Sequence, residues 1–196
     1  MKLIFATNNR HKLEEMRFAI GMETEIISLA EAGIQKEIPE PFNTLKENAQ
    51  TKARTIHQLS GGQNCFSEDT GLEVDSLHGE PGVHSARYAG EPPSFTNNIR
   101  KLLAAMSGAA DRRARFITVI CLILDNREYF FEGRCEGSIL RSPAGADGFG
   151  YDPVFVPEGA SKSFAEMSPE EKNKYSHRRK AADCLVAFLK TQLIRF

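Results

Sequence analysis

The stretch Phe116-Ile117-Thr118-Val119-Ile120-Cys121-Leu122-Ile123-Leu124 leads into Asp125-Asn126, after which apolar and polar residues alternate through Tyr129 and Phe131. β-branched and apolar residues at this density are typical of a buried strand. Asp and Asn favour a turn because their side chains hydrogen-bond to nearby backbone groups. The sequence therefore predicts a long antiparallel hairpin with strands over 115–124 and 128–140.

Strand and helix patterns alternate around this hairpin. Strands are expected over 2–7, over 25–29 and through Glu68 and Asp69 up to a turn there, and helices are expected after residue 12, over 44–58 and over 94–106. Thr44-Leu45-Lys46-Glu47 has the spacing of a capping box. Ser168-Pro169-Glu170-Glu171 combines an N-cap, a first-turn proline and a box glutamate, so we expect one helix from there almost to the C-terminus.

The fold class follows from this order of elements. A purely parallel doubly wound sheet does not accommodate a long hairpin, whereas a mixed sheet with helices packed on it does. The sequence has 196 residues, no repeats and no linker typical of independent domains. We expect one α/β domain over 1–196, with Gly- and Pro-rich loops over 76–93 and 143–153.

Composition excludes several classes of protein. The net charge is −1, so no overall basic field draws the chain to nucleic acid or an anionic membrane. No apolar run approaches the ~20 residues of a membrane span. The four cysteines form no C-x-x-C pair, and the sequence shows no secretory leader. We therefore expect reduced thiols in a cytoplasmic protein.

Two adjacent carboxylates stand out in Ser67-Glu68-Asp69-Thr70-Gly71. Neighbouring anions repel each other, and a hard divalent cation such as Mg²⁺ removes that cost. Gly71 permits a sharp turn, and the Thr70 hydroxyl can donate to a phosphate oxygen. The alternative interpretation is a solvated acidic turn between two strands, which is common.

The turn Thr7-Asn8-Asn9-Arg10-His11-Lys12 connects a strand to a helix. Free N–H groups at a helix start and the charge of Lys12 favour an anion, although an ordinary helix entry explains the pattern equally well. Another polar group is Glu40 in a proline-bracketed loop, followed by Glu47 and Asn48 in the next helix.

A further polar group joins Gly148-Phe149-Gly150-Tyr151-Asp152-Pro153 to Lys172 and Ser176-His177-Arg178. An aromatic side chain held between glycines is suited to stacking on a flat ring, and Arg178 and His177 can donate to ring carbonyls. The alternative is that Phe149 and Tyr151 fill the end of the sheet and that His177 is solvated on a helix. Phosphates, a divalent cation and a planar base together describe a nucleoside triphosphate.

In order and spacing, these motifs resemble the inosine/xanthosine triphosphate pyrophosphatase family over nearly the whole chain. The residues that carry the resemblance are Thr7 to Lys12, Glu47-Asn48-Ala49 with Lys52-Ala53, Glu68-Asp69-Thr70-Gly71-Leu72, Pro81-Gly82-Val83 with Ser85-Ala86-Arg87-Tyr88, Phe149-Gly150-Tyr151-Asp152-Pro153, and Glu171-Lys172 with Ser176-His177-Arg178.

The resemblance implies a two-lobed, mixed-sheet α/β fold with an active-site cleft between the lobes, and a homodimer. It implies Mg²⁺-dependent hydrolysis of ITP, dITP and XTP to the monophosphate and pyrophosphate. Its residue roles are triphosphate binding by Thr7, Asn8, Asn9, Arg10, His11 and Lys12; metal binding by Glu40 and Asp69; proton abstraction by Asp69; substrate contact by Thr70; and base and sugar binding by Phe149, Gly150, Tyr151, Asp152, Lys172, His177 and Arg178. Lys12 would also stabilise the leaving pyrophosphate.

Two positions depart from the family pattern. Asn8 replaces the glycine of a Thr-Gly-Asn turn, and Asn tolerates a left-handed backbone better than most residues. Glu68 replaces the first Asp of an Asp-Asp pair, so Glu68 reaches the metal directly, through water, or not at all. Two alternative functions stay open: a nucleotide pyrophosphatase of different base preference, and a non-enzymatic nucleotide- or RNA-binding module, which the near-neutral charge disfavours.

Overall fold

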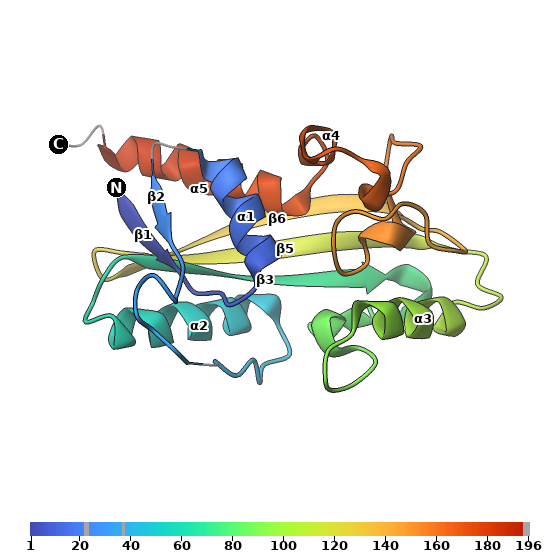
Figure 1. Cartoon of the computed structure of the whole chain (residues 1–196), viewed down its shortest axis with the longest axis horizontal. Coiled ribbons are helices and arrows are strands. Elements are labelled where there is room, and N and C mark those ends of the chain that lie inside the picture. Colours follow the sequence, from blue (N-terminus) through green and yellow to red (C-terminus); the bar gives the residue numbers. More distant parts are fainter. Residues whose placement is uncertain (22–23, 37, 194–196) are drawn as a thin grey trace. The chain divides into compact units, whose positions relative to one another are not determined.

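The structure of the chain, a computed structural model, describes residues 1–21, 24–36 and 38–193 (Figure 1). Its helices and strands are β1 (Lys2–Phe5), α1 (Arg10–Ile20), β2 (Glu25–Ile27), α2 (Leu45–Leu59), β3 (Cys65–Val74), β4 (Pro81–Gly82), α3 (Phe95–Ala105), β5 (Arg113–Leu124), β6 (Arg127–Ile139), β7 (Phe155–Pro157), α4 (Pro169–Asn173) and α5 (His177–Leu193). No helix in the described ranges is long and apolar enough to cross a membrane.

The strands form a mixed sheet, as predicted. Their order is β2-β1-β3-β5-β6-β7, with β4 paired to β3. β1 is parallel to β2 and β3, whereas β4 and β7 are antiparallel to their neighbours. Asp125 and Asn126 have φ values of 50° and 61° and join β5 to β6, which is the backbone of a tight hairpin turn. The predicted hairpin is confirmed.

The chain divides into two compact units, each built from segments that are distant in the sequence. Unit 1 comprises 1–69, 118–133 and 178–196, and unit 2 comprises 70–117 and 134–177. Strands β3, β5 and β6 contribute residues to both units.

Unit 1 has helices on both faces of its strands (Figure 1). Side chains alternate along β1: Leu3 and Phe5 pack with residues of α1 and α5, whereas Ile4 packs with Ala53 and Ile56 of α2. Leu3, Ile4 and Phe5 are all fully buried. Opposite faces of one strand therefore lead to different helices, and this arrangement positions the polar residues described below.

Unit 2 has a single apolar cluster that contains Leu72 of β3, Leu102 of α3 and Phe116 of β5. Phe155 and Phe164 complete its centre, and the Phe116 and Phe155 rings meet edge to face at 4.7 Å. The cluster anchors the end of the loop over 143–153, because Tyr151 and the following Val154 both belong to the cluster.

Two predictions of local structure are wrong. The predicted single C-terminal helix is two helices, α4 and α5, separated by a turn at 174–176 in which the backbone N–H groups of Tyr175 and Ser176 both donate to the carbonyl of Lys172. Ser176 stands immediately before α5, where serine is a favoured N-cap. The sequence also predicts an apolar side of α1 from Leu13, Met16, Phe18 and Ile20, but Phe18 is 53% exposed.

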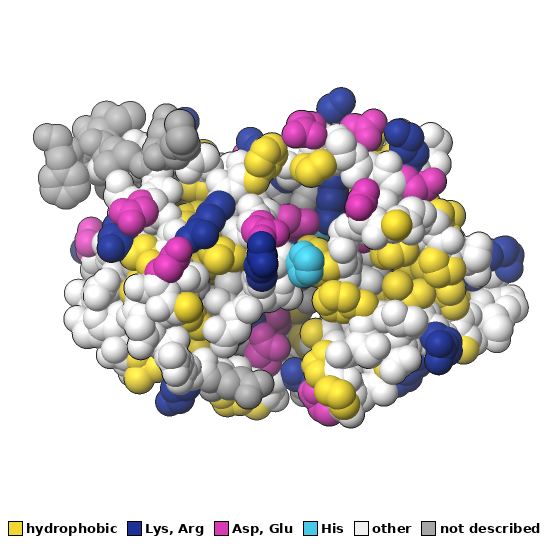
Figure 2. All heavy atoms as spheres, in the orientation of Figure 1, with side chains coloured by type: hydrophobic (Ala, Val, Ile, Leu, Met, Phe, Trp, Pro, Cys, Tyr) yellow, Lys and Arg dark blue, Asp and Glu magenta, His cyan; other side chains and the backbone are white. Residues whose placement is uncertain are grey.

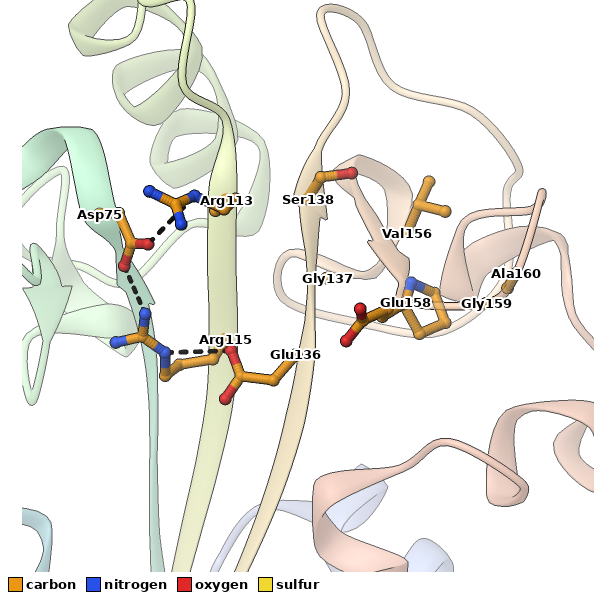
Figure 3. Close-up of a pocket in the computed structure, with 11 residues that line it drawn as sticks. Asp75, Arg113, Arg115, Glu136, Gly137, Ser138, Val156, Glu158, Gly159 and Ala160 are labelled. Atoms are coloured by element: carbon orange, nitrogen blue, oxygen red, sulfur yellow. Dashed lines mark hydrogen bonds and ion pairs between the residues drawn. The ribbon is translucent and has the colours of Figure 1, made fainter.

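The surface carries mixed charge. On the face shown in Figure 2, Lys and Arg side chains are interspersed with Asp and Glu side chains. Unit 2 also has a groove of about 480 Å³ beside β5, β6 and β7, lined by Asp75, Arg113, Arg115 and Glu136 among others (Figure 3). Arg115 lies 3.2 Å from Glu136, and Arg113 lies 3.6 Å from Asp75. The two arginines of the groove thus pair with carboxylates, and none of the predicted site residues lines the groove.

Candidate active site

Glu68 and Asp69 lie within β3, which confirms the predicted strand, but the predicted turn at these residues does not form. The strand continues through Gly71 because Phe66 pairs with Phe5 of β1 and Leu72 pairs with Gly82 of β4. Successive side chains of a strand point to opposite faces. The two carboxylates therefore point away from each other, and each is in direct contact with different cations.

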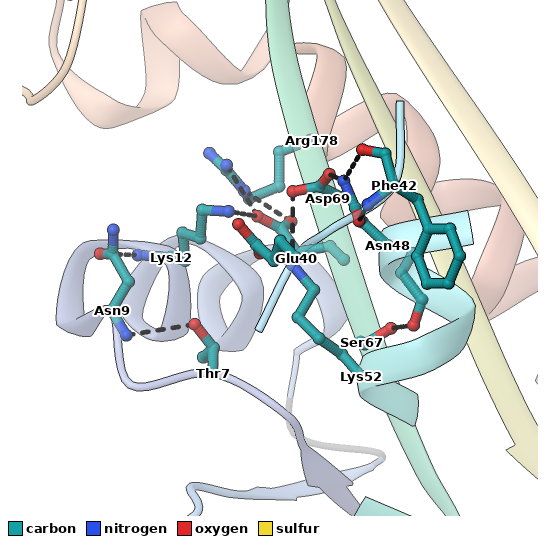
Figure 4. A network of polar contacts seen from close by, with 12 residues as sticks. Thr7, Asn9, Lys12, Glu40, Phe42, Asn48, Lys52, Ser67, Asp69 and Arg178 are labelled. Carbon is teal, nitrogen blue, oxygen red and sulfur yellow. Dashed lines mark hydrogen bonds and ion pairs between the residues drawn. The ribbon is translucent and has the colours of Figure 1, made fainter. Parts of the chain in front are cut away.

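Asp69 faces α2 and is 5% exposed. Its Oδ1 lies 3.3 Å from the Lys52 ammonium, and its Oδ2 accepts a hydrogen bond of 3.3 Å from the Asn48 amide (Figure 4). Burial raises the pKa of Asp69 above its ordinary value, although the charges of Lys52 and Lys12 act in the opposite direction. Asp69 is thus a carboxylate whose basicity is increased by its surroundings.

Lys52 links Asp69 to Glu40. Its ammonium donates to the Glu40 carboxylate as well as to Asp69. Burial alone would lower the pKa of Lys52, but the charges of Asp69 and Glu40 outweigh burial and raise it. Lys52 therefore stays charged and holds together Glu40 and Asp69, the two carboxylates for which the family resemblance implies metal binding.

Glu68 faces α1 and α5 and is surrounded by cations. The Arg178 guanidinium donates two hydrogen bonds to its carboxylate, at 2.8 and 2.9 Å, and the Lys12 ammonium lies 3.2 Å away. Arg178 also donates to Glu15. Burial alone would raise the pKa of Glu68, but Arg178 and Lys12 outweigh it and lower the pKa to about 2. Glu68 is thus a buried, ionised partner of two basic residues.

The turn before α1 connects a strand to a helix, as predicted, and the structure adds a cap at Asn9. The Asn9 side chain accepts from the backbone N–H of Lys12 at 3.2 Å, and the Asn9 N–H donates to the Thr7 hydroxyl at 3.1 Å. Arg10 and His11 are exposed, and Arg10 pairs with Glu14. Asn8 is not among the described non-glycine residues with positive φ, so the left-handed backbone considered for it is not used.

In unit 2, Phe149, Asp152 and Lys172 lie together. The Asp152 carboxylate accepts from the Phe149 N–H at 2.9 Å and from the Lys172 ammonium at 2.7 Å. The Lys172 ammonium is 5.3 Å from the centre of the half-buried Phe149 ring. Gly148 has a φ of 77°, and a side chain there would meet the Asp152 carboxylate at 2.3 Å. The glycine is thus required for the tight loop that holds Phe149.

Two other predicted residues of unit 2, Tyr151 and His177, lie in the core. Tyr151 is buried, and its hydroxyl donates to the Ser85 carbonyl at 2.8 Å. His177 is 3% exposed, and its ring stacks on Phe116 at 4.6 Å, so the interpretation of His177 as a solvated helix residue is wrong. Thr70 is half-buried on β3, and Gly150 has a φ of 63°.

Asn48 and Lys52 belong to the motifs that carry the family resemblance, but no role was predicted for them or for Glu15. The signal for the first two was their position: they stand four residues apart on α2, among the buried Ala49, Ala53 and Ile56. Polar side chains on the apolar face of a helix need buried partners. Glu15 pairs with Arg178, 163 residues away, and no local pattern reveals that contact.

The donor set of unit 1 fits a hard divalent cation. Glu40 and Asp69 converge on one ammonium, and both are carboxylates, the ligand type that Mg²⁺ takes. The described residues contain no group of three His, Cys, Asp or Glu side chains that could hold a metal ion. A Mg²⁺ ion bound by one or two carboxylates usually completes its coordination with water and substrate phosphates.

Comparison with known proteins gives consistent results. The sequence model of the Ham1 family matches residues 3–188. The chain is 53% identical over 189 residues to a dITP/XTP pyrophosphatase of Porphyromonas gingivalis, covering 96% of this chain and 97% of that protein. It is 45% identical to a dITP/XTP pyrophosphatase of Flavobacterium psychrophilum, covering 97% and 100%. The solved structure of the Staphylococcus aureus Ham1 protein is 36% identical, with a TM-score of 0.88 and coverage of 98% and 100%.

Proposed function

Because the chain belongs to the Ham1 family, it is a nucleoside triphosphate pyrophosphatase, and we propose that it hydrolyses dITP, ITP and XTP with Mg²⁺. The products would be the nucleoside monophosphate and pyrophosphate. The family resemblance that the sequence predicted is thereby confirmed. The observation that carries the proposal is the convergence of the half-buried Glu40 and the buried Asp69 on Lys52, because two carboxylates on one cation form a site of the kind Mg²⁺ occupies.

Asp69 would act as metal ligand and as proton acceptor. When bound, Mg²⁺ neutralises phosphate charge and lowers the pKa of a coordinated water. The raised pKa of Asp69 makes its carboxylate a better base than an ordinary aspartate. Asn48 and Lys52 each contact one of its oxygens, so the carboxylate is fixed in orientation.

Lys12 and the start of α1 would bind the triphosphate. The start of a helix attracts an anion through its backbone N–H groups, although in α1 the Lys12 N–H already donates to the Asn9 side chain, and the Lys12 ammonium adds positive charge at this end of the helix. Thr7, Asn8 and Asn9 shape this turn, and Arg10 and His11 complete the predicted set. Lys12 would stabilise negative charge on the departing pyrophosphate.

The base would be bound by unit 2. Phe149 would stack on the purine, with Lys172 and Asp152 fixing the loop from which the ring projects. Arg178 was predicted to donate to the C6 carbonyl. Its guanidinium is instead engaged by Glu68 and Glu15, so donation to a base requires the exchange of one of these contacts.

The cellular setting is also a proposal. A cytoplasmic location agrees with free cysteines at all four positions, and burial raises the pKa of Cys65 and of Cys121 to about 12, which makes both thiols unreactive. A homodimer rests on the family resemblance. The mixed charges of the face in Figure 2 differ from the continuous basic face of a nucleic-acid-binding protein.

A substrate panel tests the proposed function. The protein is incubated with dITP, ITP, XTP, GTP, ATP and modified pyrimidine triphosphates, with and without Mg²⁺, and pyrophosphate release is measured. We expect metal-dependent release, fastest with the 6-oxo purines that lack a C2 amino group. A preference for a pyrimidine would assign the site to a different nucleotide, and the release of single phosphates would contradict the proposed bond cleavage.

A further inference from the structure

The side chain of Asn48 holds the loop that carries Glu40. The Phe42 N–H donates to its Oδ1 at 3.0 Å, and its Nδ2 donates to the Phe42 carbonyl at 3.1 Å. Two antiparallel hydrogen bonds to one residue fix both the distance and the rotation of the backbone there, as in a strand pair. Phe42 is two residues from Glu40, so the clamp restrains the predicted metal ligand.

The same amide contacts Asp69. Its Nδ2 donates to the Asp69 Oδ2 at 3.3 Å, in addition to the Phe42 carbonyl (Figure 4). A side-chain amide has two N–H donors and one carbonyl acceptor. In Asn48 the amide nitrogen donates twice and the carbonyl oxygen accepts once, so both kinds of group are used. Asn48 is 1% exposed, so water does not compete for these bonds. One side chain therefore connects the Glu40 loop to Asp69.

Asn48 and Lys52 make this connection in different ways. They stand on the same face of α2, which is anchored by the buried Ala49, Ala53 and Ile56. Lys52 joins the two carboxylates through charge, which a bound cation would replace. Asn48 is neutral and acts on the backbone and on one carboxylate oxygen, so its contacts persist when the charge balance of the site changes.

We propose that Asn48 is a positioning residue that sets the separation and orientation of Glu40 and Asp69 for a divalent cation. The proposal rests on the proposed function, because that function assigns both carboxylates to the metal. Asn48 is neutral, so its substitution changes the geometry of the two carboxylates without changing the charge of the site. A substitution of Lys52 would change both. Loss of such a supporting contact typically lowers metal affinity about 10–100-fold.

The test compares Asn48→Leu, which keeps a similar volume without hydrogen bonds, with the smaller Asn48→Ser. The matched control is Asn98→Leu in unit 2. Asn98 is equally buried, and it anchors a loop by accepting from the Ala89 N–H and donating to the Ser85 and Ala86 carbonyls. All three variants lose a buried amide that holds a backbone segment, so their losses of thermal stability should be similar.

Two readouts isolate metal positioning. The first is Mn²⁺ binding to the protein alone, followed by electron paramagnetic resonance well below each variant's thermal midpoint. The second is the Mg²⁺ concentration that gives half-maximal pyrophosphate release from XTP. We expect both Asn48 variants to weaken Mn²⁺ binding and to raise the Mg²⁺ requirement about 10–100-fold, while Asn98→Leu changes neither more than about twofold.

Folded Asn48 variants that bind Mn²⁺ like the unmodified protein, or an Asn98→Leu that weakens binding equally, would overturn the proposal. Failure of the proposed function looks different. In that case the unmodified protein releases no pyrophosphate from any nucleotide of the panel. The Mn²⁺ affinities of the Asn48 variants and of Asn98→Leu can still be compared.

Discussion

Glu68 and Asp69 are neighbours in the sequence, yet their carboxylates occupy opposite faces of β3 and have different partners. Glu68 is bound by Arg178 and Lys12, whereas Asp69 is bound by Asn48 and Lys52. The environments shift their pKa values in opposite directions, lowering that of Glu68 and raising that of Asp69. Two carboxylates with separated pKa values are suited to separate tasks. We therefore expect their substitutions to have different consequences.

Replacing Asp69 with Asn should abolish turnover and leave the protein folded. The substitution removes a metal ligand and the base together, and general base catalysis alone contributes about 10²–10⁴-fold. The pKa of Asp69 is raised, so its ionisation counts against the folded state once the pH exceeds the unfolded value of 3.8. Asp69→Asn should therefore be at least as stable as the unmodified protein at pH 7. Near-normal turnover at saturating Mg²⁺ would show that another residue is the base; the exposed Asp183→Asn serves as control.

Glu68 should govern stability at acidic pH. Its folded pKa of about 2 lies below the ordinary value of 4.5, so its contribution is complete above pH 4.5 and is lost as the pH falls toward 2. This difference corresponds to roughly 3 kcal/mol. Glu68→Gln, which does not titrate, should be less stable than the unmodified protein at pH 7, and the gap should close toward pH 2.

Urea unfolding at a series of pH values measures this gap. The control is Glu14→Gln, a change at an exposed glutamate that pairs with Arg10. A gap between Glu68→Gln and the unmodified protein that stays constant from pH 7 to pH 3 would contradict the assignment of the charge interaction to Glu68.

Arg178 should contribute to the stability of the protein, whether or not it takes part in base choice. Removing one member of a buried ion pair leaves the other charge uncompensated and costs about 3–5 kcal/mol. We expect this loss for Arg178→Ala in chemical unfolding, and little change for Arg179→Ala, whose partner Asp183 is exposed. The ratio of ITP to ATP hydrolysis, measured below the unfolding midpoint, tests the base-donor prediction separately. An unchanged ratio would limit Arg178 to holding Glu68.

Local signals of the sequence predicted much of this fold. Thr44 is the N-cap of α2, the Ser168 box starts α4, and the Asp125-Asn126 turn closes the hairpin. Each of these depends on hydrogen bonds within a few residues. The extension of β3 through Gly71 was missed because its cause is non-local: pairing with β1 and β4 outweighs the turn preference of the sequence around Asp69.

In the candidate site, too, features that depend on nearby residues were predictable and contacts between distant positions were not. The capped entry to α1 and the loop that holds Phe149 follow from nearby residues. The pairing of Arg178 with Glu68 joins positions 110 residues apart, and only the folded structure brings them together. Strand alternation could have indicated that Glu68 and Asp69 face different helices, had the strand been predicted to continue past Asp69 without a turn.

Lys12 should act on phosphates and not on the base. Its ammonium lies at the start of α1, 3.2 Å from Glu68. A hydrogen bond from a charged donor contributes about 1.5–3 kcal/mol, so Lys12→Ala should lower kcat/KM for XTP at least about tenfold. Inhibition by free inosine should change little. The matched control is Lys2→Ala, an exposed cation of β1 outside the proposed triphosphate site. An equal effect of Lys12→Ala on nucleoside and nucleotide would place Lys12 away from the phosphates.

Phe149 should stabilise every base equally. Its ring is half-buried, 6.2 Å from the ring of Phe95 and 5.3 Å from the Lys172 ammonium, and its backbone is fixed by Asp152. Stacking on an aromatic side chain is worth about 1–3 kcal/mol per base and does not depend on base identity.

Phe149→Ala should therefore lower kcat/KM for ITP, XTP, GTP and ATP by similar factors and preserve their ratios, whereas Phe149→Tyr, which keeps an aromatic face, should restore most of the activity. Phe18→Ala removes an exposed aromatic ring of α1 and controls for the loss of a surface ring. A Phe149→Ala enzyme that loses activity with ITP but keeps it with ATP would mean that this position reads the base edge and not its face.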